Sequence, residues 1–159
     1  MQEIKDTLSN FFSALEKLKE LGIILNAKDF TGQIGEWIAS IVYDGNRSQN
    51  GIQRDWDFIS NEKFYQVKSS AKSKSTTVKY SKVDYRDDAK IDFLIIIVFS
   101  ENYELNSFYE IPWEIAKKKI KTTGKKVLEN KINWSDVAEF KKNLEELKQK
   151  HEILAVFIK

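Results

Sequence analysis

Three polar side chains that could bind a metal ion and a phosphate are predicted to share one face of a β-hairpin. The segment DWDFISNEKFYQVKSS, residues 55–70, holds two runs of strand-forming residues on either side of the polar turn SNEK. If Ile59 pairs with Phe64 across this turn, Asp57 lies opposite Gln66. Side chains alternate between the faces of a strand, so Asp57, Gln66 and Lys68 project from the same face. A carboxylate, an amide oxygen and an ammonium group within reach of one another can hold a divalent ion beside a phosphate.

The apolar residues of the hairpin are predicted to point the other way: Trp56, Phe58, Tyr65 and Val67. A structural hairpin with one solvated face would show the same division, so the pattern alone leaves both interpretations open. Asp55 is a rival acidic residue, because it lies two positions before Asp57 and shares its face. We prefer Asp57 as the functional carboxylate, since it falls opposite Gln66.

The hairpin resembles the motif of a known group of enzymes, the PD-(D/E)xK or restriction-endonuclease-like nuclease superfamily. The core of that family pairs an acidic residue on one strand with an (E/Q)xK tripeptide on the next. Asp57 matches the acidic position, and Gln66-Val67-Lys68 matches the tripeptide. The family commonly adds a glutamate that follows a glycine on the preceding helix, and Gly35-Glu36 in GQIGEWIASIVY looks like this element. The resemblance covers residues 30–115, which would form the motif-bearing core.

This resemblance implies a metal-dependent phosphodiesterase. Mg²⁺, or alternatively Mn²⁺, would be held by Asp57, by the side-chain oxygen of Gln66 and by the backbone carbonyl of Val67. Glu36 would bind the same ion through water or hold a second ion. Lys68 would orient the attacking water and stabilise the charge of the transition state. Because Gln66 stands where the family more often has glutamate, the site carries one negative charge fewer and is expected to hold metal less tightly.

Two functions follow as expectations. The first is an endonuclease that cleaves DNA with Mg²⁺, of the restriction or defence type. The alternative is a catalytically weak or inactive nuclease-fold module that binds nucleic acid or a partner protein. The presence of Asp57, Lys68 and Glu36 together favours the enzyme, because a scaffold without activity has little reason to keep all three.

Lysine-rich segments follow the hairpin and could bind the phosphates of DNA. The net charge is only +2, yet residues 68–90 hold seven lysines and arginines against three aspartates. Residues 117–131 hold seven lysines against one glutamate. The candidate contacts to nucleic acid are Lys72, Lys74, Lys79 and Lys82. Such segments are also often solvated surface, an alternative that charge alone leaves open.

Composition bounds the remaining possibilities. The chain has 159 residues, of which 42% are hydrophobic, which suits one globular domain over residues 1–159. It contains no cysteine and one histidine, His151, so disulfides, thiolate metal sites and histidine clusters are excluded. The N-terminus lacks a signal-peptide pattern, and no apolar run approaches the roughly 18 residues of a membrane span. We therefore expect a cytoplasmic protein that does not enter a membrane.

Hydrophobic periodicity predicts an α/β fold, with a mixed central β-sheet flanked by helices and a restriction-endonuclease-like core. Helices are expected over residues 2–21, 112–120 and 135–147. Another is expected to begin with Asp29 or Thr31 as its cap and to end before Asp44. Strands besides the hairpin are expected over 91–99, 107–111 and 152–158. The first of these should be a central strand covered on both faces, and the second its antiparallel neighbour. The segment TTGKK, residues 122–126, is expected to be a loop.

The N-terminal helix, residues 1–22, carries an apolar stripe with spacings of four and three residues: Ile4, Leu8, Phe11, Leu15 and Leu18. The stripe suits packing on the protein's own sheet, which we expect slightly more, or the seam of a coiled coil. Phe12 and Leu21 widen the apolar surface beyond the needs of a seam. Cutting both strands of a duplex often uses two subunits related by a two-fold axis, so we expect a homodimer with this helix as the candidate interface.

Overall fold

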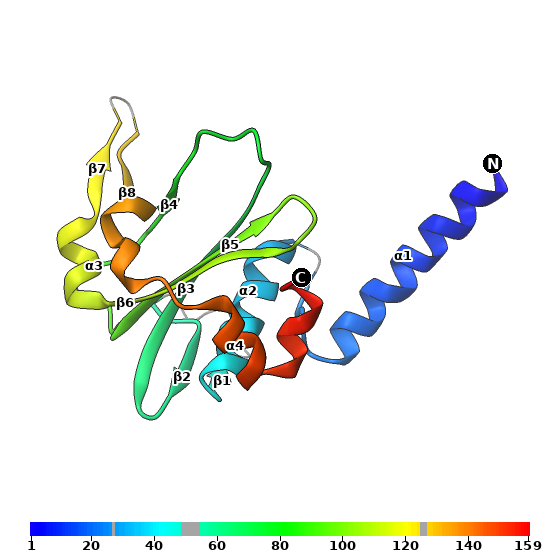
Figure 1. The fold of residues 1–159 in the computed structure, drawn as a ribbon, viewed down its shortest axis with the longest axis horizontal. Coiled ribbons are helices and arrows are strands. Elements are labelled where there is room, and N and C mark those ends of the chain that lie inside the picture. Colours follow the sequence, from blue (N-terminus) through cyan, green and yellow to red (C-terminus); the bar gives the residue numbers. More distant parts are fainter. Residues whose placement is uncertain (27, 49–54, 125–126) are drawn as a thin grey trace.

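The computed structural model describes residues 1–26, 28–48, 55–124 and 127–159, and it has the predicted mixed α/β architecture (Figure 1). A five-stranded sheet has the order β1-β2-β3-β5-β6. Its strands are β1 (Asn46–Arg47), β2 (Phe58–Ser60), β3 (Lys63–Lys72), β5 (Phe93–Ser100) and β6 (Leu105–Pro112). β3 and β5 are parallel and the other neighbouring pairs are antiparallel, which confirms the mixed sheet.

Helices flank the sheet on both sides. One face packs against α2 (Phe30–Val42), α4 (Leu144–Lys150) and the 3₁₀ helix η2 (Glu152–Val156). The other face packs against α3 (Trp113–Lys119), the 3₁₀ helix η1 (Trp134–Phe140) and a second sheet. The sheet therefore separates a first core, on the α2 side, from a second core, on the α3 side.

The apolar run expected to be a buried strand is β5. Ile95 and Ile97 are fully buried in the first core, whereas Leu94 and Ile96 are fully buried in the second. This alternation confirms that the strand is covered on both faces. β6 is its antiparallel neighbour, also as predicted.

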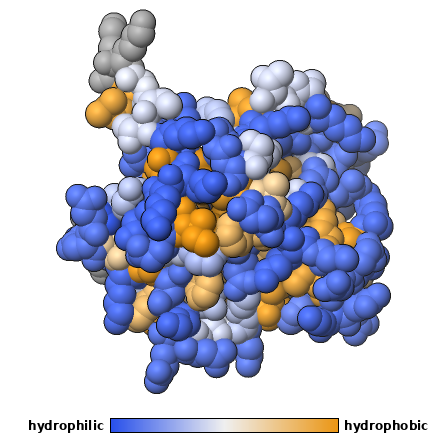
Figure 2. Space-filling model, turned by 60° about the vertical axis from the view of Figure 1, so that its left-hand side comes forward, coloured by the Kyte–Doolittle hydropathy of each residue, from blue (hydrophilic) through white to orange (hydrophobic). Residues whose placement is uncertain are grey.

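The second sheet has three antiparallel strands in the order β4-β8-β7. These are β4 (Tyr80–Lys82), β8 (Glu129–Asn133) and β7 (Lys121–Thr123). The expected loop over residues 122–126 is therefore wrong at Thr122 and Thr123, which lie in β7. Residues 125–126 fall outside the described residues. The strands form because Ile132 of β8 is fully buried in the second core. Figure 2 shows that this side of the molecule is mainly hydrophilic, with small apolar areas between polar groups.

The hairpin has the predicted register, with Phe58 opposite Tyr65 and Ile59 opposite Phe64. The rings of Phe58 and Tyr65 stack in the first core, with centroids 4.5 Å apart. Trp56 was expected on the same face, and this expectation is wrong. Its ring contacts Phe64 instead, at 5.6 Å between centroids, because β2 begins only at Phe58 and strand alternation does not hold before it.

The single helix expected over residues 135–147 is two short helices, η1 and α4. Between them the chain returns to the sheet, where the N–H of Lys142 donates to the carbonyl of Phe108 at 2.8 Å. Asn143 then begins a new helix, since its side chain accepts hydrogen bonds from two N–H groups in the first turn of α4. The cap explains why the helical pattern is interrupted.

The strand expected over residues 152–158 is also wrong, because this segment contains the 3₁₀ helix η2. Leu154 and Ile158 are buried, while Ile153 and Val156 are 43% and 69% exposed. Ala155 and Val156, which follow Leu154, are both exposed, so burial does not alternate every two residues as it would in a half-buried strand. A short apolar run by itself does not distinguish a strand from a helix.

Helix α1 (Gln2–Glu20) projects away from the sheet, with the N-terminus at its far end (Figure 1). None of its residues is buried, and Ile4, Leu8 and Phe11 are 59%, 49% and 54% exposed. Only its C-terminal half approaches the start of α2, around an apolar hollow. The expectation that this helix packs on its own sheet is therefore wrong. No helix in the described part of the chain is long and apolar enough to cross a membrane.

Candidate active site

Helix α2 brings Glu36 against the sheet through a close contact at the preceding glycine. Asp29 caps the helix, because its side chain accepts a hydrogen bond from the N–H of Gly32 at 2.8 Å. Further along, a Cβ atom at Gly35 would lie 1.7 Å from the Oγ of Ser69 on β3. Only glycine permits this approach, so the contact fixes where Glu36 lies relative to the hairpin.

Asp57 is held at the start of the hairpin by hydrogen bonds to β3. Its Oδ2 accepts from the N–H of Val67 at 2.6 Å, and its own N–H donates to the carbonyl of Tyr65 at 2.8 Å. These bonds hold Asp57 against the two residues of β3 that flank Gln66. Burial raises the pKa of the Asp57 carboxyl, and the bond to Val67 and the charge of Lys68 act against that rise.

Glu36 and Asp57 lie close enough to repel each other. Burial raises the pKa of Glu36 to about 7, and the negative charge of Asp57 contributes to the increase. Arg47 counteracts it, since its Nη2 is 3.4 Å from Oε2 of Glu36. The Nη1 of the same arginine donates to the carbonyls of Gly22 and Ile23, at 3.0 and 3.2 Å, just after α1. The two carboxylates thus form a site that favours positive charge.

Gln66 presents a buried oxygen that lacks a partner. Its Nε2 donates to the carbonyl of Asp84 at 3.3 Å, but its Oε1 is buried and accepts no hydrogen bond from any described residue. A buried acceptor left unpaired is costly, on the order of 1–3 kcal/mol. A water molecule or a cation beside this oxygen would remove that cost.

If a divalent metal ion binds at this site, these residues would supply its oxygen ligands. Glu36 and Asp57 offer carboxylates, and Gln66 offers its unpaired amide oxygen. Val67 offers only its backbone, because its side chain is buried in the first core. Among the described residues no group of three His, Cys, Asp or Glu side chains could hold a metal, so Gln66 would have to supply the third side-chain ligand.

The rival carboxylate, Asp55, is engaged elsewhere. Its two oxygens lie 3.2 and 2.8 Å from Nε and Nη2 of Arg86, in a two-bond ion pair. This pair joins the start of the hairpin to the segment after β4. The geometry therefore supports the preference for Asp57.

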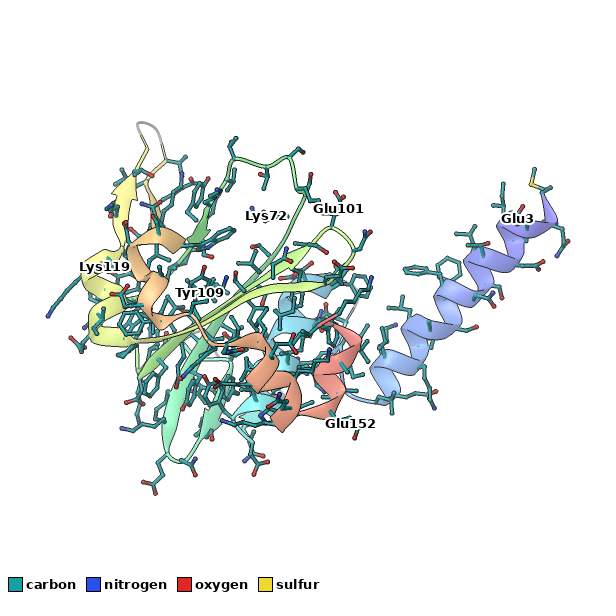
Figure 3. The ribbon with its side chains drawn as sticks, viewed as in Figure 1. Glu3, Lys72, Glu101, Tyr109, Lys119 and Glu152 are labelled. Atoms are coloured by element: carbon teal, nitrogen blue, oxygen red, sulfur yellow. The ribbon has the colours of Figure 1, made fainter. Side chains whose placement is uncertain are left out.

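The four lysines predicted to bind DNA do not lie in equivalent places. Lys72 and Lys82 line one cleft together with Lys68. Lys72 lies at the end of β3, where the chain leaves for β4 (Figure 3). Lys74 and Lys79 are exposed in the segment between those strands and do not line the cleft.

Two residues near the site were not found from the sequence. Arg47 belongs to β1, a two-residue strand, and nothing in its local sequence separates it from a solvated arginine. Ser70 follows Lys68 by two positions on β3, and its Oγ is buried without a partner among the described residues. Side chains two positions apart on a strand share a face, so the place of Ser70 two residues after Lys68 was the signal that could have identified it.

No protein-family model matches this chain, and a search of curated proteins found no match to its sequence.

The raised pKa of Glu36 predicts that the protein loses stability as pH rises. Between about pH 4.5 and 7 the folded state binds this proton more tightly than the unfolded chain, so the free energy of unfolding falls over that window. Glu36→Gln cannot ionise and should avoid this loss. At pH 8, without metal, we expect the variant to exceed the parent by about 1–3 kcal/mol in urea unfolding.

The difference in free energy of unfolding between Glu36→Gln and the parent should shrink as pH falls and be lost near pH 4.5. The exposed Glu139→Gln, which lies in η1, is the matched control and should show no such dependence. An equal difference between parent and Glu36→Gln at pH 5 and pH 8 would contradict the assignment of Glu36 to a buried, repulsive site.

Proposed function

We propose that this protein is a Mg²⁺-dependent phosphodiesterase that cleaves DNA as an endonuclease, of the restriction or defence type. The observation that carries the proposal is the unpaired, buried Oε1 of Gln66, which lies on β3 between the two residues bonded to Asp57 and two residues before Lys68. Buried acceptors are normally paired, so this oxygen is available to a ligand such as a cation. A cytoplasmic location fits such a substrate.

Each residue has a distinct task in the proposed reaction. Asp57, Gln66, Glu36 and the Val67 backbone would hold Mg²⁺ or Mn²⁺, which lowers the pKa of a bound water and offsets negative charge on the phosphate. Lys68 would orient the attacking water and stabilise the charge that develops on the phosphate oxygens. Water would attack phosphorus in line and lose a proton to solvent as the new P–O bond forms. The opposite P–O bond would break, and the leaving oxygen would take a proton from solvent.

One observation favours the alternative, a nuclease-fold module that binds nucleic acid or a partner protein without cutting. One oxygen of Asp57 is already bonded to the N–H of Val67, and Glu36 is already paired with Arg47. With Gln66 in place of glutamate, the site also has a low negative charge for binding a cation. The lysine-lined cleft is common to both proposals.

A plasmid assay distinguishes the two functions. Supercoiled DNA is incubated with the protein and Mg²⁺ or Mn²⁺, and EDTA provides the metal-free control. The nuclease should produce nicked and linear forms that EDTA prevents. The binding module should leave the plasmid supercoiled while still binding DNA, with an affinity that falls steeply as salt rises.

We also propose that the protein is a homodimer that pairs through α1. The apolar stripe of this helix is exposed along its N-terminal half, where neither the sheet nor a neighbouring helix of the described chain covers it. An exposed apolar surface of this kind marks an interaction site. A two-fold dimer would also supply two active sites for the two strands of a duplex.

Sedimentation measures this assembly directly. The parent should sediment as a dimer, and Ile4→Glu combined with Leu8→Glu should give a folded monomer, because both side chains are exposed in the single chain. Ser13→Glu, on the opposite side of the same helix, is the control and should remain a dimer. A monomeric parent would rule out the dimer, and an unfolded double variant would contradict the exposed position of α1.

A further inference from the structure

A row of polar side chains follows one face of β3 beyond the proposed active site. By strand alternation, Gln66, Lys68, Ser70 and Lys72 project from the same face. The residues beside them on β5 are apolar and belong to the second core: Leu94, Ile96 and Val98. The polar row therefore lies along the boundary of that core, where β3 faces β4.

This row forms one wall of a cleft of about 340 Å³. Besides Lys68, Ser70 and Lys72 of β3, the cleft is lined by Ser69 of the same strand, whose side chain lies against Gly35 of α2, and by Tyr80 and Lys82 of β4. The Oγ of Ser70 is buried and makes no hydrogen bond to any described residue. A hydroxyl group that is buried beside a cleft without a partner is available to donate to a ligand.

The charge of the cleft determines which ligand would bind there. Lys82 is paired with Glu129, but Lys68 and Lys72 form no ion pair or hydrogen bond in the part of the chain that the structure describes. Two unpaired ammonium groups on either side of a free hydroxyl donor attract an anion with several acceptor oxygens. A phosphate group has this chemistry.

We infer that Ser70 and Lys72 bind the phosphate next to the one that is cleaved, so that a nucleic-acid strand lies along β3. This inference rests on the proposed function, because Lys68 marks the position of the cleaved phosphate. At about 3.3 Å per strand residue, Ser70 lies roughly 7 Å further along than Lys68. That distance is comparable to the spacing of consecutive phosphates in one strand. The substrate is thus a polynucleotide rather than a small phosphodiester, and Ser70 is a positioning residue.

Neighbouring serines on β3 provide a matched test. Ser69 also has a buried, unpaired Oγ, but it points to the other face, towards Gly35 of α2. Ser69→Ala and Ser70→Ala therefore remove the same group from opposite sides of one strand. Neither removes an existing hydrogen bond, so both variants should fold and show the parental melting temperature.

The assay measures the binding of a fluorescently labelled, 12-nucleotide single-stranded DNA in EDTA, where no cleavage occurs. Ser70→Ala should raise the Kd about tenfold, since a hydrogen bond to a charged group is lost, and Ser69→Ala should leave it unchanged. Equal Kd values for parent and Ser70→Ala would overturn the inference. Equal weakening by both variants, or a parent that does not bind the oligonucleotide, would also overturn it.

The plasmid assay tests the proposed nuclease activity independently of phosphate binding at Ser70. If Ser70 is required for oligonucleotide binding but the plasmid is not cut, the phosphate site stands and the nuclease proposal fails. If the parent cuts the plasmid and Ser70→Ala cuts it with an unchanged KM, the nuclease proposal stands and the phosphate site at Ser70 fails.

Discussion

Lys68→Ala is expected to abolish metal-dependent cleavage of DNA, with a loss of at least about 10²–10³-fold in rate. The reason is that Lys68 supplies the positive charge that would stabilise the transition state, whereas Arg47, the other cation that acts on Asp57, is already paired with Glu36. The side chain is half-buried and makes no hydrogen bond or ion pair with the described residues, so its removal should cost little stability. Plasmid cleavage and urea unfolding, measured together, check both halves of this prediction.

Asp57→Asn should abolish cleavage as well, but for a different reason. The amide oxygen still accepts from the N–H of Val67, so the hairpin keeps its geometry while the site loses a charged ligand. Calorimetry with Mn²⁺ separates the two variants: Lys68→Ala should still bind the ion, and Asp57→Asn should not. Lys63→Ala, at the far end of β3, is the control and should cut like the parent. Parental activity in either site variant would show that the site is misassigned.

The parts of the fold that were predicted correctly are those whose pattern is local. The register of the hairpin follows from the turn between Ile59 and Phe64, and both residues pair as expected. The alternating burial of β5 agrees with its uninterrupted apolar run, which is typical of a strand covered on both faces.

The parts that failed depend on contacts between distant residues. The break between η1 and α4 arises because Lys142 bonds to Phe108 of β6, which no local pattern reveals. The C-terminal residues form a 3₁₀ helix because Leu154 and Ile158 are both needed in the first core. The exposure of α1 is likewise invisible in its sequence, since an apolar stripe looks the same whether it meets its own sheet or another chain.

The same distinction applies to the site. Glu36, Asp57, Gln66 and Lys68 could be named because the order and spacing of their residue types resemble a known motif. Arg47 could not, and alternation could place Ser70 only on the face of Lys68, because the importance of both residues arises from neighbours brought in by the fold. Arg47 becomes relevant only when β1 lies beside Glu36, and Ser70 only when β4 closes the cleft over β3.

Gly35→Ala should lower the free energy of unfolding by about 1–3 kcal/mol, the usual cost of adding atoms to a packed contact. At an exposed position in a helix the same change would stabilise the protein by about 0.8–1 kcal/mol. A loss of stability would therefore indicate that Gly35 lies in a packed contact. Here the new Cβ would lie 1.7 Å from Oγ and 2.7 Å from Cβ of Ser69. Either α2 must move away from β3 or the serine must be displaced, and both changes would shift Glu36.

Removing the serine side chain should restore most of that loss. In Gly35→Ala combined with Ser69→Gly, the two nearest atoms are absent, and the next is Cδ1 of Ile97 at 3.7 Å, an ordinary contact. Ser69→Gly alone should cost about 0.5–1 kcal/mol, because glycine weakens a strand interior. Urea unfolding of the parent, both single variants and the double variant forms a complete cycle, in which a favourable interaction between the two substitutions is expected. Additive effects, or a Gly35→Ala variant more stable than the parent, would show that α2 does not approach β3 at this point. Glu36 would then lose the contact that places it beside Asp57.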